Sequence, residues 1–244
     1  MAINNRRLRA NLSLLAFLWE GKDMAKIYFK HGTMGSGKSL DLIRAVYNYT
    51  ERGMTPLVFK PSLDTREGND YCVIKSRTGA EVLANWIDND DDDLSTIIFE
   101  LNDRIHTTYY LNDSRLNMEN NKLMVDAIFI DEAQFLTEKQ IDKLQEICYS
   151  YNIPILCYGL KLDFQSHLFP GAKRLIELAD DIQELIGICH CGKRAKQNAR
   201  VIDGKFAEQG DLVQIGGNES YIALCNECYY KKDLGGKYNG KFSK

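Results

Sequence analysis

The clearest chemical pattern in the sequence is a phosphate-binding loop. Residues 32–39 match G-x-x-x-x-G-K-[ST] in full, between a β-rich run and a helical pattern. Glycines let the backbone curl around an anion, and the following helix adds its positive end. Lys38 would then reach the β- and γ-phosphates of a nucleoside triphosphate, and the Ser39 hydroxyl would bind Mg²⁺. The expected phosphate contacts are Gly32, Thr33, Met34, Gly35, Ser36, Gly37, Lys38 and Ser39.

Two carboxylates follow a second buried run. Asp131 comes directly after the apolar residues 125–130, where an acid can hold a hydrated Mg²⁺ beside the phosphates. Glu132 is adjacent and would face another way, because side chains alternate in direction at a strand end. Such a glutamate orients water in an ATPase and accepts the proton of a substrate hydroxyl in a kinase. The residues themselves do not choose between these two acceptors.

Four of the seven cysteines form two close pairs near the C-terminus. Cys189 and Cys191 make a C-x-C pair, and Cys225 and Cys228 make a C-x-x-C pair. Four thiolates on two turns can surround Zn²⁺ tetrahedrally, which predicts a structural zinc site, with unmetallated thiols as the alternative. One intervening residue is fewer than usual in a zinc knuckle, which leaves His190 as a substitute ligand. The cysteine usage predicts a reduced, cytoplasmic protein.

Strands that alternate with helices must position these groups. We expect strands over residues 26–30, 56–61, 96–99, 125–130 and 153–158, and helices over 39–49, 78–87, 172–178 and from a capping box at 137–140. This order predicts a parallel α/β sheet flanked by helices, of the P-loop (RecA-like) type. After about residue 186, glycines, paired cysteines and short β-type runs replace the alternation.

Length and composition limit the alternatives. The chain has 244 residues and a net charge of −3, so it lacks the broad basic face of a protein that binds duplex nucleic acid. The apolar run at 12–19 is too short to span a bilayer, and we expect residues 1–23 to be an optional extension and 89–93 to be a solvated acidic loop. We predict a P-loop domain over 24–185, a zinc-binding domain over 186–235 and a flexible tail over 236–244.

Residues 131–134, Asp-Glu-Ala-Gln, also look like the DExx box of helicases. A helicase core needs two α/β domains, whereas about 160 residues of α/β pattern fit one domain. A GTPase is disfavoured because the chain has no [NT]-K-x-D motif. The alternatives left open are a P-loop ATPase with a zinc ribbon that acts on nucleic acid, and a non-catalytic nucleotide sensor.

Several motifs in one order resemble a known family. They are the phosphate loop, Asp64-Thr65-Arg66, residues 131–135, 159–165 and 215–221, and the cysteine pairs. From about Lys26 to Lys231 the sequence resembles the zinc-containing, cellular-type thymidine kinases, and the C-x-C pair resembles their bacterial branch. The resemblance implies a small C-terminal zinc-ribbon-like domain that carries a lasso loop, and transfer of the ATP γ-phosphoryl group to the 5′-hydroxyl of thymidine or deoxyuridine. It also suggests a homotetramer.

The resemblance assigns roles to particular residues. Glu132 matches the general base, while Asp64, Arg66, Asp131 and Gln134 join the ATP site. The nucleoside contacts that it implies are Met34, Phe135, Leu160, Phe164, Val213, Gln214, Ile215, Gly216, Gly217 and Tyr221. A planar base needs such an apolar slot with a few fixed hydrogen bonds. The zinc would fasten the base of a loop that opens and closes over the nucleoside.

Overall fold

A six-stranded parallel sheet forms the centre of the computed structural model, which describes residues 24–64, 72–88, 94, 125–210 and 221–236. The strand order is β5-β2-β6-β7-β1-β8, and every neighbouring pair runs parallel. The strand bounds are β1 Ile27–His31, β2 Pro56–Pro61, β5 Asn85–Ile87, β6 Ala127–Ile130, β7 Ile155–Gly159 and β8 Asp181–Glu184.

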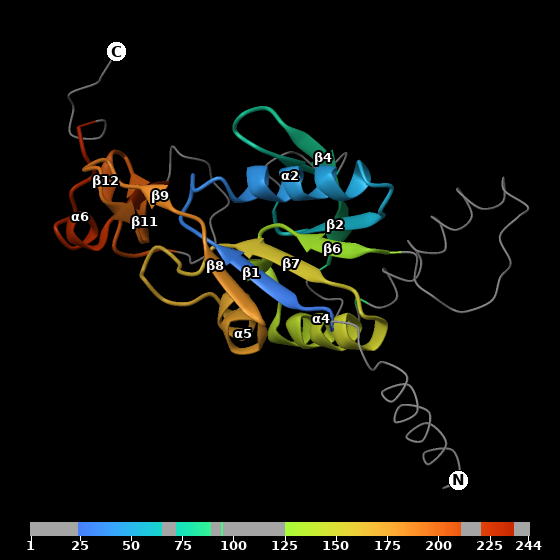
Figure 1. Cartoon of the computed structure of the whole chain (residues 1–244). Helices are drawn as coiled ribbons and strands as arrows, with labels where there is room; N and C mark the ends of the chain where they lie inside the picture. The colour runs from blue at the N-terminus through green and yellow to red at the C-terminus, as the bar shows by residue number, and fades with distance from the viewer. Residues whose placement is uncertain (1–23, 65–71, 89–93, 95–124, 211–220, 237–244) are drawn as a thin grey trace, which may run out of the picture.

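Helices cover both faces of this sheet (Figure 1). Helix α2 (Lys38–Thr50) lies on one face, and α4 (Glu138–Tyr151) and α5 (Pro170–Leu178) lie on the other. Leu42 of α2 packs with Phe129 and Tyr158 on the first side, while Ile128 and Ile130 join the core beneath α4 and α5. Burial on both faces explains the continuous apolar runs of the central strands. The predicted P-loop α/β sheet flanked by helices is confirmed.

The start of α4 follows the predicted capping box. The Thr137 side chain accepts a hydrogen bond from Gln140 N at 3.1 Å, and the Gln140 side chain accepts one from Thr137 N at 3.0 Å. These two bonds satisfy main-chain donors that the first helical turn cannot use. The local sequence thus determines where this helix begins.

The helix predicted over residues 78–87 is wrong. The segment forms β4 (Glu81–Leu83) and then β5 at the sheet edge. Strand β4 pairs antiparallel with β3 (Val73–Lys75), where no strand was expected, through a turn where Gly79 has φ of +88°. Pairing with neighbouring strands outweighs the weak helical spacing, since a short apolar run is compatible with either periodicity.

One other strand differs from expectation. Strand β8 extends the sheet beside β1 but was not predicted, because its largely exposed residues lack an alternating apolar face. The strand expected over 96–99 lies outside the described residues, as do residues 1–23 and the acidic run 89–93. The sheet therefore ends in a polar edge strand that the sequence pattern does not reveal.

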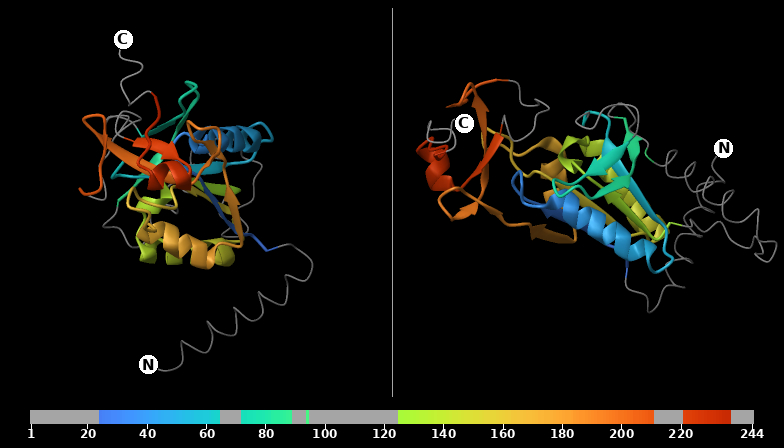
Figure 2. Two further views of the ribbon diagram at one scale, coloured as in Figure 1. Left: turned by 90° about the vertical axis from the view of Figure 1, so that its left-hand side faces the viewer. Right: turned by 90° about the horizontal axis from the view of Figure 1, so that it is seen from above.

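The C-terminal region is built from short strands around a separate core. Its elements are β9 Gly187–Ile188, β10 Arg194–Ala195, β11 Gln197–Ile202, β12 Lys205–Phe206, β13 Tyr221–Leu224 and α6 Asn226–Tyr230. Strand β11 lies between β12 and β13, and its residues Ala199 and Val201 pack with three of the paired cysteines. The region lies beyond one end of the main sheet (Figure 2). The domain boundary near residue 186 stays a prediction.

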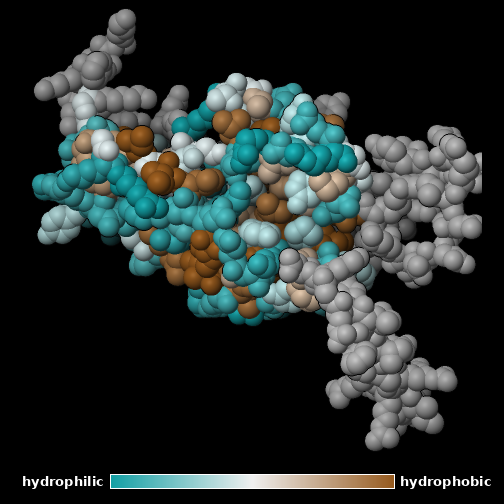
Figure 3. Space-filling view, in the orientation of Figure 1, coloured by the Kyte–Doolittle hydropathy of each residue, from teal (hydrophilic) through white to brown (hydrophobic). Residues whose placement is uncertain are grey.

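Hydrophobic residues on the face seen in Figure 3 form separate patches within a mostly hydrophilic surface. In the described ranges, no helix combines the length and hydropathy required to cross a membrane.

Candidate active site

The ends of three parallel strands bring the predicted phosphate and acid residues together. Strand β1 leads into the phosphate loop, β6 ends just before Asp131, and β7 ends at Gly159. Gly32 N donates to Gly159 O at 3.3 Å, which joins the start of the loop to β7. Ligands of open α/β sheets bind at this carboxyl edge of the strands.

The phosphate loop depends on its glycines. Gly35 and Gly37 have φ of +76° and +86°, in the left-handed region that glycine adopts without strain. A Cβ on Gly32 would lie 2.4 Å from Ser36 Oγ and 2.5 Å from Leu185 O, so there is no room for a side chain. Successive N–H groups in such a turn make a concave anion site at the start of α2.

Lys38 and Ser39 begin helix α2, directly after the phosphate loop. The buried Lys38 ammonium donates to the carbonyl oxygens of Gly32 and Thr33, at 3.3 and 3.0 Å. Ser39 Oγ donates to Asp131 Oδ2 at 2.9 Å, so a hydroxyl and a carboxylate that are 92 positions apart in sequence meet. Oxygen donors of this kind suit Mg²⁺.

Glu132 is held in an unusual conformation. Its φ of 50° and ψ of 37° are left-handed, which costs a residue other than glycine about 1 kcal/mol or more. Gln134 Nε2 donates to Glu132 Oε2 at 2.6 Å, and Gln134 Oε1 accepts from Leu160 N at 2.9 Å. Gln134 therefore ties the carboxylate to the segment that follows β7, although the sequence had placed it only among the ATP contacts.

Asp64 forms a buried ion pair with Lys60. Lys60 Nζ is 3.1 Å from Asp64 Oδ2, both side chains are at most 5% exposed, and the ammonium lies 5.2 Å from the Trp86 ring centroid. We infer that Lys60 orients Asp64. Sequence reasoning did not select Lys60, but a lysine inside the apolar strand β2 is a usable signal. Arg66 lies outside the described residues.

The predicted base contacts come from several segments. Phe135 and Leu160 are partly buried against the main core, and Phe135 packs edge-on against Phe169. Phe164 is 2% exposed and lies under the Arg200 guanidinium, 5.4 Å from its ring centroid. Tyr221 begins β13. The remaining predicted contacts, Val213, Gln214, Ile215, Gly216 and Gly217, lie outside the described residues.

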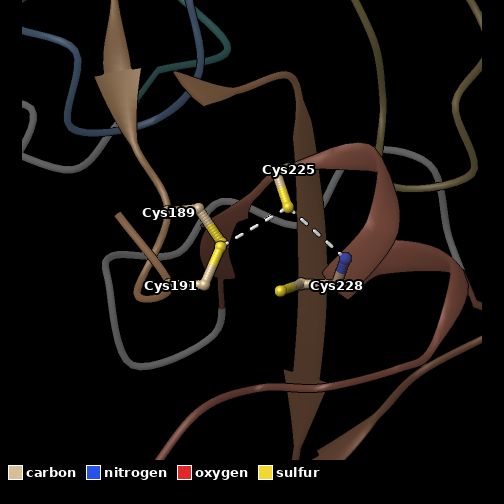
Figure 4. A group of neighbouring side chains, drawn as sticks. All are labelled: Cys189, Cys191, Cys225 and Cys228. Carbon is tan, nitrogen blue, oxygen red and sulfur yellow. Dashed lines mark hydrogen bonds between the residues drawn. The ribbon is translucent and has the colours of Figure 1, made fainter. Parts of the chain in front are cut away.

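The four paired cysteines gather at one point (Figure 4). Their sulfur atoms all lie within 4.8 Å of one another, and Cys191 Sγ is 3.7 Å from Cys225 Sγ. Tetrahedral Zn–S bonds of about 2.3 Å place sulfurs about 3.8 Å apart, so the cluster fits a zinc ion. A hydrogen bond from Cys228 N lowers the pKa of the Cys225 thiol to about 7, which favours a thiolate. His190 belongs to a second group with Cys228 and Asp233.

A small pocket lies beside the start of the phosphate loop. It is lined by His31, Gly32, Thr33, Lys161, Leu162, Glu184, Lys196 and Asn198. Burial, followed by the nearby Lys161 ammonium, lowers the pKa of His31 to about 4, so the imidazole is neutral at pH 7. His31 is therefore an uncharged, packed side chain beside the loop.

Comparison with known proteins identifies the family of this chain. A family model described as thymidine kinase matches residues 25–229. A thymidine kinase of Legionella pneumophila is 41% identical over 88% of this chain and 93% of its own length, and one of Mesorhizobium japonicum is 41% identical over 87% and 94%. A thymidine kinase of Streptococcus pyogenes is 36% identical over 86% of this chain and all of its own. With the phosphate loop, the acidic pair and the cysteine cluster in one fold, this chain belongs to the thymidine kinase family.

Proposed function

We propose that this protein transfers the γ-phosphoryl group of ATP to the 5′-hydroxyl of thymidine, and of deoxyuridine, as a step of nucleoside salvage. The observation that carries the proposal is the Ser39–Asp131 contact beside Glu132, because it joins a phosphate loop, a magnesium-type site and a candidate base at one sheet edge. The family membership supports thymidine as the acceptor.

The phosphate loop and Lys38 would bind the triphosphate. Loop N–H groups and the start of α2 supply positive potential, and the Lys38 ammonium would move from loop carbonyls to phosphate oxygens. Ser39 and Asp131 would hold Mg²⁺, which neutralises charge on the phosphates. Asp64, oriented by Lys60, and Arg66 would complete the phosphate contacts.

Glu132 would act as the general base. Its carboxylate would accept the proton of the 5′-hydroxyl as that oxygen attacks the γ-phosphorus, with ADP as the leaving group. Gln134 holds one carboxylate oxygen and so restricts the rotation of the side chain. A fixed base of this kind is worth roughly 10²- to 10⁴-fold in rate.

The nucleoside would lie in an apolar slot. Met34, Phe135, Leu160 and Phe164 would contact the base, with Tyr221 and the segment 213–217 closing over it. Deoxyuridine lacks only the 5-methyl group of thymidine, and a single methyl group changes the free energy of discrimination by only about 1–3 kcal/mol, so deoxyuridine should be accepted as well. Zinc on the four cysteines would tie residues 189–191 to residues 225–228, which flank the region that contains the lasso segment. A cytoplasmic homotetramer is part of the proposal.

An acceptor screen tests the proposal. The protein is incubated with ATP, Mg²⁺ and each natural nucleoside, and the products are separated by chromatography. Thymidine and deoxyuridine monophosphates are expected, with little product from purine nucleosides. ATP hydrolysis stimulated by DNA or RNA, without any nucleoside monophosphate, would instead favour an ATPase with a zinc ribbon. ATP binding without any turnover would favour a nucleotide sensor.

A further inference from the structure

Strand β11 has two faces with different partners. Ala199 and Val201 pack into the core that contains the paired cysteines. Asn198 and Arg200 alternate with them and so point the other way. Both are polar yet only 4% and 7% exposed, and they face segments of the P-loop sheet. One strand therefore separates the cysteine cluster from the phosphate loop.

The Asn198 side chain joins two loops that are distant in sequence. Its Oδ1 accepts a hydrogen bond from Met34 N at 2.8 Å, inside the phosphate loop. Its Nδ2 donates to Leu162 O at 3.4 Å, in the segment that follows β7. A main-chain N–H only donates and a carbonyl only accepts, so these partners fix which amide atom is the oxygen.

The two loops carry the two halves of the proposed site. Met34 lies in the loop that would bind the donor phosphates, while Leu162 lies between Leu160 and Phe164, which would contact the acceptor base. A single buried amide thus sets the spacing between donor and acceptor. Gln134 makes a comparable link on the other side, from Glu132 to Leu160 N.

We propose that Asn198 is a positioning residue that holds the phosphate loop at a fixed distance from the acceptor loop. The role rests on the proposed kinase function, but the contact itself does not. Asn198 acts through Met34 and Leu162 and touches no reacting atom. Misplacement of reactants by about 1 Å can cost roughly 100-fold in rate, so the effect should appear in turnover more than in the binding of either substrate alone.

The first test compares Asn198→Ala with wild type. We expect kcat for thymidine phosphorylation to fall by roughly 10- to 100-fold, while the Kd of ATP alone and of thymidine alone stay within about threefold. The control is Gln197→Ala, on the same strand, whose side chain contacts Ser166 and Asn226 and not the phosphate loop. Unchanged kcat in Asn198→Ala, or an equal fall in the control, would overturn the proposal.

The second test does not depend on the substrate. Amide hydrogen exchange at Met34 should be roughly tenfold faster in Asn198→Ala, because its acceptor is lost. Asn198→Asp keeps an oxygen for Met34 N but loses the donor to Leu162, so Met34 should stay protected while kcat falls. If Asn198→Ala does not fold, the test rests on Asn198→Asp. Slow amide exchange at Met34 in that variant supports the hydrogen bond to residue 198, and fast exchange overturns the proposal. Wild-type protein that lacks kinase activity but shows Asn198-dependent protection would refute only the proposed function.

Discussion

Replacing Glu132 with glutamine tests the assignment of the general base. The substitution keeps the length of the side chain and an oxygen that can accept from Gln134 Nε2, now 2.6 Å from Oε2. It changes a charge-assisted hydrogen bond into a neutral one, which costs about 1 kcal/mol of folding free energy. The left-handed backbone at position 132 is as tolerable for glutamine as for glutamate. The fold should therefore survive, with Tm lower by only about 2–4 °C.

The effect on catalysis should be much larger. Glutamine cannot accept the hydroxyl proton, so the barrier should rise by about 3–5 kcal/mol, or roughly 10²- to 10⁴-fold in kcat. ADP release at saturating ATP and thymidine measures kcat, and ATP binding is measured separately. Glu146→Gln makes the same chemical change at an exposed ion pair with Lys143 and serves as the control. A kcat for Glu132→Gln within threefold of wild type would refute the role of Glu132 as base.

Three further predictions concern the surroundings of the site. Cys225→Ser should lower bound zinc from one equivalent and raise the thymidine KM; unchanged zinc by metal analysis would show that the ligand set is wrong. Gly159→Ala should place a Cβ 2.5 Å from Gln134 Oε1 and lower kcat about tenfold, an effect absent if Gln134 does not position Glu132. Folding lowers the pKa of His31 from 6.5 to about 4, so between these pH values the imidazole is protonated in the unfolded chain but neutral in the folded protein. The free energy of unfolding therefore falls as the pH drops from 6.5 towards 4. The free energy of unfolding, measured with urea, should fall between pH 7.5 and pH 5 by about 2 kcal/mol more in wild type than in His31→Gln. An equal fall in both proteins would contradict a buried neutral imidazole.

Much of the fold could be predicted because its signals are local. The phosphate loop, the buried strand before Asp131 and the capping box at Thr137 each lie within a few residues, and each has a direct physical cause. The wrong helix over 78–87 and the missed strand β8 share another cause. Their conformations depend on neighbouring strands, such as β2 beside β5 and β1 beside β8, and no local pattern encodes that pairing.

The same contrast between local signals and distant contacts applies to the candidate site. Its motif residues, Gln134 among them, could be selected from the sequence, and Lys60 stands out as a lysine in an apolar strand, whereas the contacts that orient the site could not be predicted. Lys60, Gln134 and Asn198 act through partners between 2 and 164 positions away, and no local pattern predicts which partner each of them contacts. Such contacts follow from the packing of three loops at one sheet edge, which only the three-dimensional arrangement shows.

The most direct measurement follows the phosphoryl group itself. The protein is incubated with Mg²⁺, thymidine and ATP labelled at the γ-phosphate, and 5′-deoxythymidine, which lacks the attacking hydroxyl, replaces thymidine in a parallel reaction. Label should appear in thymidine 5′-monophosphate in the first reaction and in no nucleotide product of the second. Label released only as inorganic phosphate in both reactions would contradict the transfer to a nucleoside hydroxyl.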